Sequence, residues 1–97
     1  GTPMPKPTDG WIDFAIYSKP GPGGDGRIEL FANGKWIVSV TGHIGHNDPG
    51  LGANQYFKFG PYRDGAPEEW VMYYDNFIRS PNCADLLDAE ACKMLGL

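Results

Sequence analysis

The chain has 97 residues, with 8 Lys and Arg against 12 Asp and Glu, so its formal net charge is -4. Nucleic-acid-binding domains carry a basic face, and this acidic balance argues against a nucleic-acid partner. The 14 glycines and 9 prolines favour turns and short strands over a helical bundle. No apolar run approaches the roughly 20 residues of a membrane-spanning helix, so we expect no membrane partner.

The chain begins with a lead-in that is followed by a strand. Residues 1–10 are rich in proline and lack a hydrophobic period, which predicts an extended segment. From Trp11 to Tyr17 the period is two, as in a β-strand, and one face carries Ile12, Phe14 and Ile16. Residues 19–26, KPGPGGDG, predict a loop, because proline and glycine fit poorly into a strand ladder.

A β-hairpin is expected next. Residues 27–31 predict a second strand, and Asn33-Gly34 after it is a strong hairpin pattern, because both residues tolerate a positive φ. Residues 35–41 predict the returning strand, with one face that carries Trp36, Val38 and Val40.

The remaining residues predict five further elements. We expect a loop over residues 42–54, a strand over 55–63, a turn over 64–69, a strand over 70–80 and a helix over 82–95. Ser80-Pro81 resembles a helix N-cap with proline at the first helical position, and Gly96 is expected to end the helix.

Cys83 and Cys92 are the two cysteines of the chain. On one unbroken helix they would lie about 13 Å apart, at roughly 1.5 Å per residue, whereas a disulfide needs Cα atoms within about 7 Å. A bridge therefore requires the segment to bend. The sequence leaves two alternatives open: two free thiols, or a bridge in a secreted protein.

Five strands joined by hairpins and loops, with one terminal helix, predict an all-β antiparallel architecture. One short helix covers only part of an apolar sheet face, so we expect a portion of an antiparallel β-sandwich. The alternative is a small sheet that folds alone with the helix as its lid. The expected organisation is an extended lead-in (residues 1–10), a β-sandwich portion (residues 11–80) and a C-terminal helical tail (residues 81–97).

Residues 55–63, QYFKFGPYR, carry the pattern that points most directly to chemistry. Alternation along a strand places Tyr56, Lys58 and Tyr62 on one face, and Gly60 between them leaves room for a ligand to approach the backbone. Such amphipathic strands are also common on solvated sheet faces. The pattern alone therefore leaves a plain structural strand open.

The run YFKFGPYR resembles the Y-F-K-x-G-x-Y motif near the end of jelly-roll polysaccharide lyases, which include alginate, glucuronan and heparin lyases. WIDF from Trp11, DGRIEL from Asp25 and NGK from Asn33 are similar to the stretches upstream of that motif. YYDNF from Tyr73 resembles the closing strand, so the resemblance spans roughly residues 11–78. It implies a concanavalin-like jelly roll of which this chain is the C-terminal portion.

The resemblance implies an enzyme that cleaves an anionic uronic-acid polysaccharide by β-elimination. A base removes the C5 proton, an acid protonates the leaving oxygen at C4, and the neighbouring carboxylate is neutralised. The tyrosine that ends the motif is the acid in these families, and sometimes also the base; this role carries over to Tyr62. Lys58 then supplies a positive field or binds the carboxylate, and Tyr56 and Arg63 are expected to contact substrate.

These families complete the site with a glutamine or asparagine and a histidine from earlier strands. Residues 1–54 contain no matching Q-I-H motif. We therefore expect sequence absent from this chain, or a second polypeptide that completes the sandwich, to supply them. A remnant without activity stays open, as does a non-catalytic, lectin-like carbohydrate-binding module.

His43 and His46 lie in the glycine-rich loop with Asp48 close behind, at a spacing that is loose for a metal site. Three roles stay open for this loop: metal binding, a place on the rim of the substrate cleft, or a plain solvent-exposed loop. We predict both histidines as substrate-binding residues and predict no metal. The resemblance implies no required cofactor, allows a calcium ion at Asp48 or Asp75-Asn76, and implies a secreted, extracellular protein.

Overall fold

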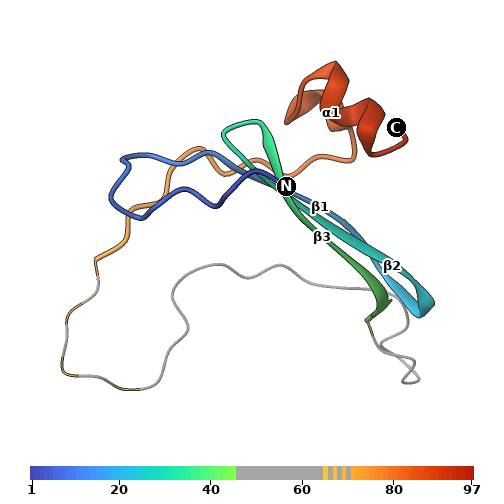
Figure 1. Cartoon of the computed structure of the whole chain (residues 1–97), viewed down its shortest axis with the longest axis horizontal. Helices are drawn as coiled ribbons and strands as arrows, with labels where there is room; N and C mark the ends of the chain where they lie inside the picture. The colour runs from blue at the N-terminus through green and yellow to red at the C-terminus, as the bar shows by residue number, and fades with distance from the viewer. Residues whose placement is uncertain (46–64, 66, 68, 70) are drawn as a thin grey trace.

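The computed structural model describes residues 1–45, 65, 67, 69 and 71–97. Within them, three antiparallel strands form one sheet in the order β1 (Phe14–Lys19), β2 (Gly21–Ala32) and β3 (Lys35–Ile44). A 3-10 helix, η1 (Cys83–Asp85), and a short helix, α1 (Ala89–Met94), follow near the C-terminus (Figure 1). The described part of the chain is mostly β with a short C-terminal helix, which confirms the predicted all-β class.

The β2–β3 hairpin forms as the Asn33-Gly34 pair predicts. The φ angle is 51° at Asn33 and 79° at Gly34, and Ala32 pairs with Lys35 across the two-residue turn. Left-handed backbone at both turn positions matches the twist of the flanking strands. Asn33 also holds the residue before β1, because its N–H donates to Asp13 O at 2.7 Å and its Oδ1 accepts from Asp13 N–H at 3.0 Å.

The start of β2 differs from the prediction. The predicted loop over residues 19–26 is wrong, because β2 already begins at Gly21. Gly21 pairs with Ile44 and Gly26 pairs with Gly42, so residues 22–25 are an irregular insertion in the strand. Glycine makes the insertion possible, since a Cβ on Gly21 would lie 2.1 Å from the Gly26 nitrogen.

A bulge in β3 changes the faces that alternation predicts. Leu30 pairs with Val38, but Phe31 pairs with Trp36, so Ile37 is an extra residue. Trp36 therefore shares a face with Phe31. The prediction that Trp36 lies on the same face as the valines of β3 is wrong.

The sheet has two chemically different faces. We call the face with Phe31 and Trp36 the tail face, because C-terminal residues pack on it, and the opposite face the open face. The open face is apolar, and its side chains are those of Phe14, Ile16, Ile28, Leu30, Val38 and Val40. On the outer strands they stay exposed, with 53% of Ile16 and 45% of Val38 accessible to solvent. The helix is therefore not a lid over the apolar face.

The C-terminal residues pack on the tail face through a small core. Phe31 is 1% exposed and contacts Ala91 and Leu95, the latter 4% exposed. Tyr17 and Trp36 lie half-buried beside this cluster. Figure 1 shows α1 lying to one side of the sheet, near the end where the β2–β3 turn lies. Burial of Leu95 and Phe31 supplies the apolar contact that a six-residue helix needs in order to be stable.

The predicted single helix over residues 82–95 is wrong, because the backbone breaks between η1 and α1. Asp88, rather than Ser80, caps α1: its Oδ1 accepts from the Ala91 N–H at 2.8 Å. The break brings Cys83 and Cys92 together in a disulfide with Cα atoms 5.9 Å apart. Gly96, at a φ of 82°, ends the helix as predicted.

The strand predicted over residues 70–80 is wrong for its described part, because residues 71–80 belong to no strand. Asn76 has a φ of 57°, which interrupts an extended path, and its N–H donates to Asp75 Oδ1 at 2.8 Å. The aromatic side chains of this segment are exposed, 76% for Tyr73 and 60% for Phe77. The strand predicted over residues 55–63 lies outside the described residues.

Candidate functional site

A buried carboxylate organises the tail face. Glu29 is 3% exposed and lies on the central strand, and its side chain meets donors from β2 and β3. Oε1 accepts from Arg27 Nε at 2.9 Å and from the Ser39 hydroxyl, and Oε2 accepts from Trp36 Nε1 at 2.8 Å. Each oxygen therefore accepts a hydrogen bond from a donor of the same sheet, which stabilises the buried charge.

The ionisation of Glu29 follows from these partners. Burial works to raise the pKa of the carboxyl group, but hydrogen bonds from Ser39, Arg27 and Trp36 outweigh it. The positive charge of Arg27 acts in the same direction. The pKa of Glu29 is therefore held below its usual value, and the group is ionised at neutral pH.

Arg27 connects this carboxylate to the C-terminal tail. Its Nε binds Glu29, while its Nη1 donates to the Leu95 carbonyl oxygen at 3.0 Å. The guanidinium carbon also lies 5.6 Å from the ring centroid of Tyr17 on β1, a cation–π contact. Because Nε, Nη1 and one face of the guanidinium contact groups of the protein, the Arg27–Glu29 pair serves to hold the tail to the sheet.

The sequence analysis did not assign a role to Glu29. The spacing of Arg27 and Glu29 on a predicted strand places them on one face, which was a usable indication. The approach of Trp36 to Glu29 depends on the bulge at Ile37, and no pattern in the sequence indicates that bulge.

His43 is the predicted site residue that the described structure contains. It lies exposed near the end of β3, with Nδ1 2.8 Å from the carbonyl oxygen of Pro22. A carbonyl oxygen only accepts, so Nδ1 carries the hydrogen in this contact, and in the neutral ring Nε2 is then the acceptor. His43 is thus positioned by the insertion in β2, with one nitrogen left for an external donor.

The other predicted site residues lie outside the described residues; they are Tyr56, Lys58, Tyr62, Arg63 and His46. Their roles therefore stay predictions. Asp48, one of the oxygen donors considered for calcium, also lies outside. In the described ranges, no group of three or more His, Cys, Asp and Glu side chains is arranged to hold a metal ion.

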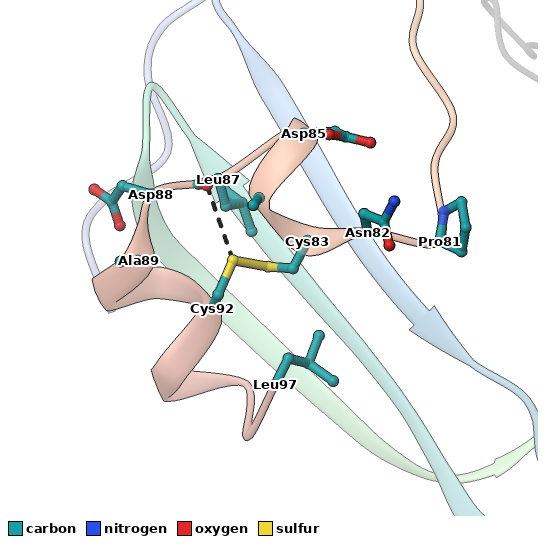
Figure 2. A pocket seen from close by; sticks show the side chains of 10 residues that line it. Pro81, Asn82, Cys83, Asp85, Leu87, Asp88, Ala89, Cys92 and Leu97 are labelled. Carbon is teal, nitrogen blue, oxygen red and sulfur yellow. Dashed lines mark hydrogen bonds between the residues drawn. A yellow bond between two sulfur atoms is a disulfide. The ribbon is translucent and has the colours of Figure 1, made fainter.

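An open hollow lies on the tail itself. Figure 2 shows the side chains that line it, with the Cys83–Cys92 disulfide in its wall and the carboxylates of Asp85 and Asp88 at its edge. Leu97 points toward the same hollow. Figure 2 shows these two carboxylates pointing in different directions, so they do not form one cation site, and the reactive group that lines the hollow is the disulfide.

The comparison with protein families identifies the family of the chain. The chain belongs to the polysaccharide lyase family, because the family model described as "Polysaccharide lyase" matches residues 1–78. The matched range contains all three strands and ends before η1 and α1. No curated protein and no solved structure matches the chain. Within the described residues, no helix is both long and apolar enough to cross a membrane.

Proposed function

We propose that this chain is the C-terminal portion of a polysaccharide lyase that cleaves an anionic, uronic-acid polysaccharide by β-elimination. The observation that carries the proposal is the family match over residues 1–78, which includes the run YFKFGPYR. The residues assigned to the chemistry are Tyr62 and Lys58, with Tyr56, Arg63, His43 and His46 as substrate contacts.

The chemistry requires three groups. A base takes the proton from C5, the electron pair forms the C4–C5 double bond, and the C4–O bond breaks as an acid protonates the leaving oxygen. A phenol has a pKa near 10 and keeps its proton at neutral pH, so Tyr62 can serve as that acid. Lys58 offsets the charge that develops at the sugar carboxylate when the C5 proton leaves.

His43 supports a substrate-facing role at the rim of the site. Its ring is exposed, and the bond from Nδ1 to Pro22 O leaves Nε2 to accept a sugar hydroxyl. Because the imidazole is held at one nitrogen, little ordering is needed for it to bind substrate. We place it among the binding residues, not among the catalytic ones.

The exposure of the apolar open face supports the proposal that a second polypeptide completes a β-sandwich. Sandwiches pack two sheets face to face about 10 Å apart, and an exposed apolar face of this kind is uncommon on a finished soluble domain. Residues 11–80 would then be one part of the sandwich, residues 1–10 its lead-in and residues 81–97 its tail.

The disulfide supports secretion. Bridges persist in oxidising, extracellular environments and are rare in reducing ones. An extracellular location also suits an enzyme that acts on a polymer too large to enter a cell. We propose no required cofactor, and calcium as an optional structural ion.

The test is the ultraviolet absorbance of the unsaturated product when the protein, together with any polypeptide that copurifies with it, meets glucuronan, alginate or a heparin-type polymer. Tyr62→Phe should lower kcat/KM by about 100-fold or more, as expected for loss of a general acid. Tyr73→Phe is the matched control, because Tyr73 is 76% exposed. Equal activity of the Tyr62→Phe variant and the native protein would contradict the assignment.

A lectin-like module is the second candidate. Exposed aromatic side chains, with Trp11 71% and Tyr73 76% accessible, are suited to stack on sugar rings. Calorimetric binding of a polyuronate without any unsaturated product would favour this function over the lyase.

A further inference from the structure

We propose that the Cys83–Cys92 bridge is a redox-sensitive clasp that holds the C-terminal residues as a removable cover on the tail face. The proposal concerns residues 83–97, which lie beyond the range matched by the family model, and it does not depend on the lyase chemistry.

The cover depends on the bridge for its own fold. It consists of a three-residue 3-10 helix and a six-residue α-helix, both far shorter than the about 12 to 15 residues at which an isolated helix becomes marginally stable. The disulfide joins the two across a sequence separation of 9. Closing this loop removes conformations from the unfolded segment, so α1 and η1 stay together and can present Leu95 and Ala91 as one apolar surface.

The cover contacts the sheet through a small number of groups. Leu95 and Ala91 pack on Phe31, and a long-range hydrogen bond from Arg27 Nη1 to Leu95 O joins the two parts. Glu29, by contrast, is held by Arg27, Trp36 and Ser39, which all belong to the sheet. Loss of the cover therefore leaves the Glu29 cluster and the strand ladder intact.

The bridge borders an open hollow through which a small reductant can reach it: Cys83 is half-buried, whereas Cys92 is 9% exposed. Both cysteines line the hollow on the tail, and Figure 2 shows their sulfurs at its wall. The Cys92 Sγ atom lies 3.8 Å from the Leu87 carbonyl oxygen. A bridged sulfur carries no hydrogen, so this is a packing contact while the bridge is closed, and it becomes a possible thiol hydrogen bond only after reduction.

The chemical step is thiol–disulfide exchange with a dithiol reductant. One thiolate of the reductant attacks Cys83 Sγ or Cys92 Sγ, the S–S bond breaks, and the other cysteine leaves as a thiolate. The second thiol of the reductant then displaces the remaining cysteine and forms the disulfide of the reductant. Two electrons pass to the protein, and the two cysteine sulfurs take up the two protons that the reductant gives up.

The tail face therefore has two states, covered and uncovered. With the bridge closed, Phe31 is 1% exposed and Trp36 is half-buried. With the bridge open, the two short helices lose their link, Phe31 and Trp36 become accessible, and Arg27 loses its bond to Leu95 O while it keeps its contacts with Glu29 and Tyr17. An oxidising environment thus keeps this face covered, and a reducing one uncovers it.

The experiment is hydrogen exchange read by mass spectrometry on the whole chain, with and without dithiothreitol. We expect the amides of residues 91–97 to exchange at least about tenfold faster after reduction, whereas the amides of β2 and β3 change little. The C83S/C92S variant should behave as the reduced chain does, and dithiothreitol should leave it unchanged. Trp36 fluorescence, in a W11F/W70F background, should shift to longer wavelength on reduction.

Two results would overturn the proposal. Unchanged exchange of residues 91–97 in both the reduced chain and C83S/C92S would show that the bridge does not hold the cover. Loss of protection in β2 and β3 at the same time would show that the cover is not separable from the sheet. The variant L95A, in which the bridge stays closed, provides an independent check, because it should expose Phe31 without any reductant.

Discussion

The guanidinium of Arg27 donates to the carbonyl oxygen of Leu95 at 3.0 Å, across 68 positions of sequence. This bond joins the central strand to the end of the C-terminal helix, and Arg27 binds the buried carboxylate of Glu29 at the same time. Arg27 therefore links the sheet and the tail alongside the packing of Phe31 against Ala91 and Leu95, and Glu29 balances its charge.

Replacing Arg27 should loosen the tail more than the sheet. Arg27→Gln removes the charge partner of Glu29 and the donor to Leu95 O, so we expect a loss of about 2 kcal/mol in the free energy of unfolding. Denaturant unfolding measures this value. Lys19→Gln on β1 is the matched control, because Lys19 is exposed. A loss equal to that of the control would mean that the Arg27 contacts add nothing to stability.

Acid should weaken the fold through Glu29. The pKa of Glu29 is lower in the folded protein than its usual value, so the group stabilises the fold above the unfolded glutamate pKa of about 4.3. That contribution is lost as the pH falls through the lowered folded value.

Denaturant unfolding between pH 7 and pH 2 should therefore show a steeper acid loss for the native chain than for Glu29→Gln. At neutral pH the variant should be less stable by about 1 to 2 kcal/mol, and the difference should shrink in acid. Parallel pH profiles would contradict the role assigned to the carboxylate.

Adding a side chain at Gly34 should destabilise the hairpin turn. Its φ of 79° is unfavourable for a residue with a Cβ, so Gly34→Ala should lower the free energy of unfolding by about 1 kcal/mol. Gly23→Ala is the control, because space at Gly23 is open and its φ is not in the left-handed range. Equal unfolding midpoints for the two variants would count against the turn geometry.

The cap of α1 should matter for the cover. Asp88→Ala removes the acceptor for the Ala91 N–H and should destabilise the helix by about 1 kcal/mol, whereas Asp88→Asn keeps an oxygen acceptor and should cost less. Exchange rates of the amides of residues 91–95 report this difference. Identical rates in Asp88→Ala and the native chain would show that the cap is not needed.

The open face should control association. Val38→Lys places a charge in the middle of an apolar surface, so it should abolish binding of a completing sheet and raise solubility. Sedimentation of the chain with its copurified polypeptide measures the first effect. Lys35→Glu, at the exposed end of the same strand, is the control. Undiminished association of Val38→Lys would rule out this face as the contact surface.

Local chemistry accounts for the predictions that the structure confirms. The Asn33-Gly34 turn forms because both residues accept a positive φ, whatever surrounds them. Gly96 ends α1 for the same reason. The all-β class followed from alternation and from the many turn residues, which are also local properties.

The errors have a common origin in contacts between distant residues. Residues 71–80 are rich in residue types that favour strands but lie in no ladder, because a strand exists only where a partner pairs with it. The single helix predicted for residues 82–95 breaks because Asp88 caps a new start and the disulfide draws Cys83 to Cys92. Of the predicted site residues, only His43 is described, and its anchoring by Pro22 depends on the insertion in β2.

The amino-acid sequence by itself determined the strand class, the hairpin turn and the membership of the polysaccharide lyase family, because these depend on residue types and their spacing. Only the tertiary structure decided which face of the sheet the tail covers and that Glu29 is buried among Arg27, Trp36 and Ser39. The reason is physical: strand register, one bulge and one disulfide set those contacts, and each depends on how residues that are not chain neighbours meet in space.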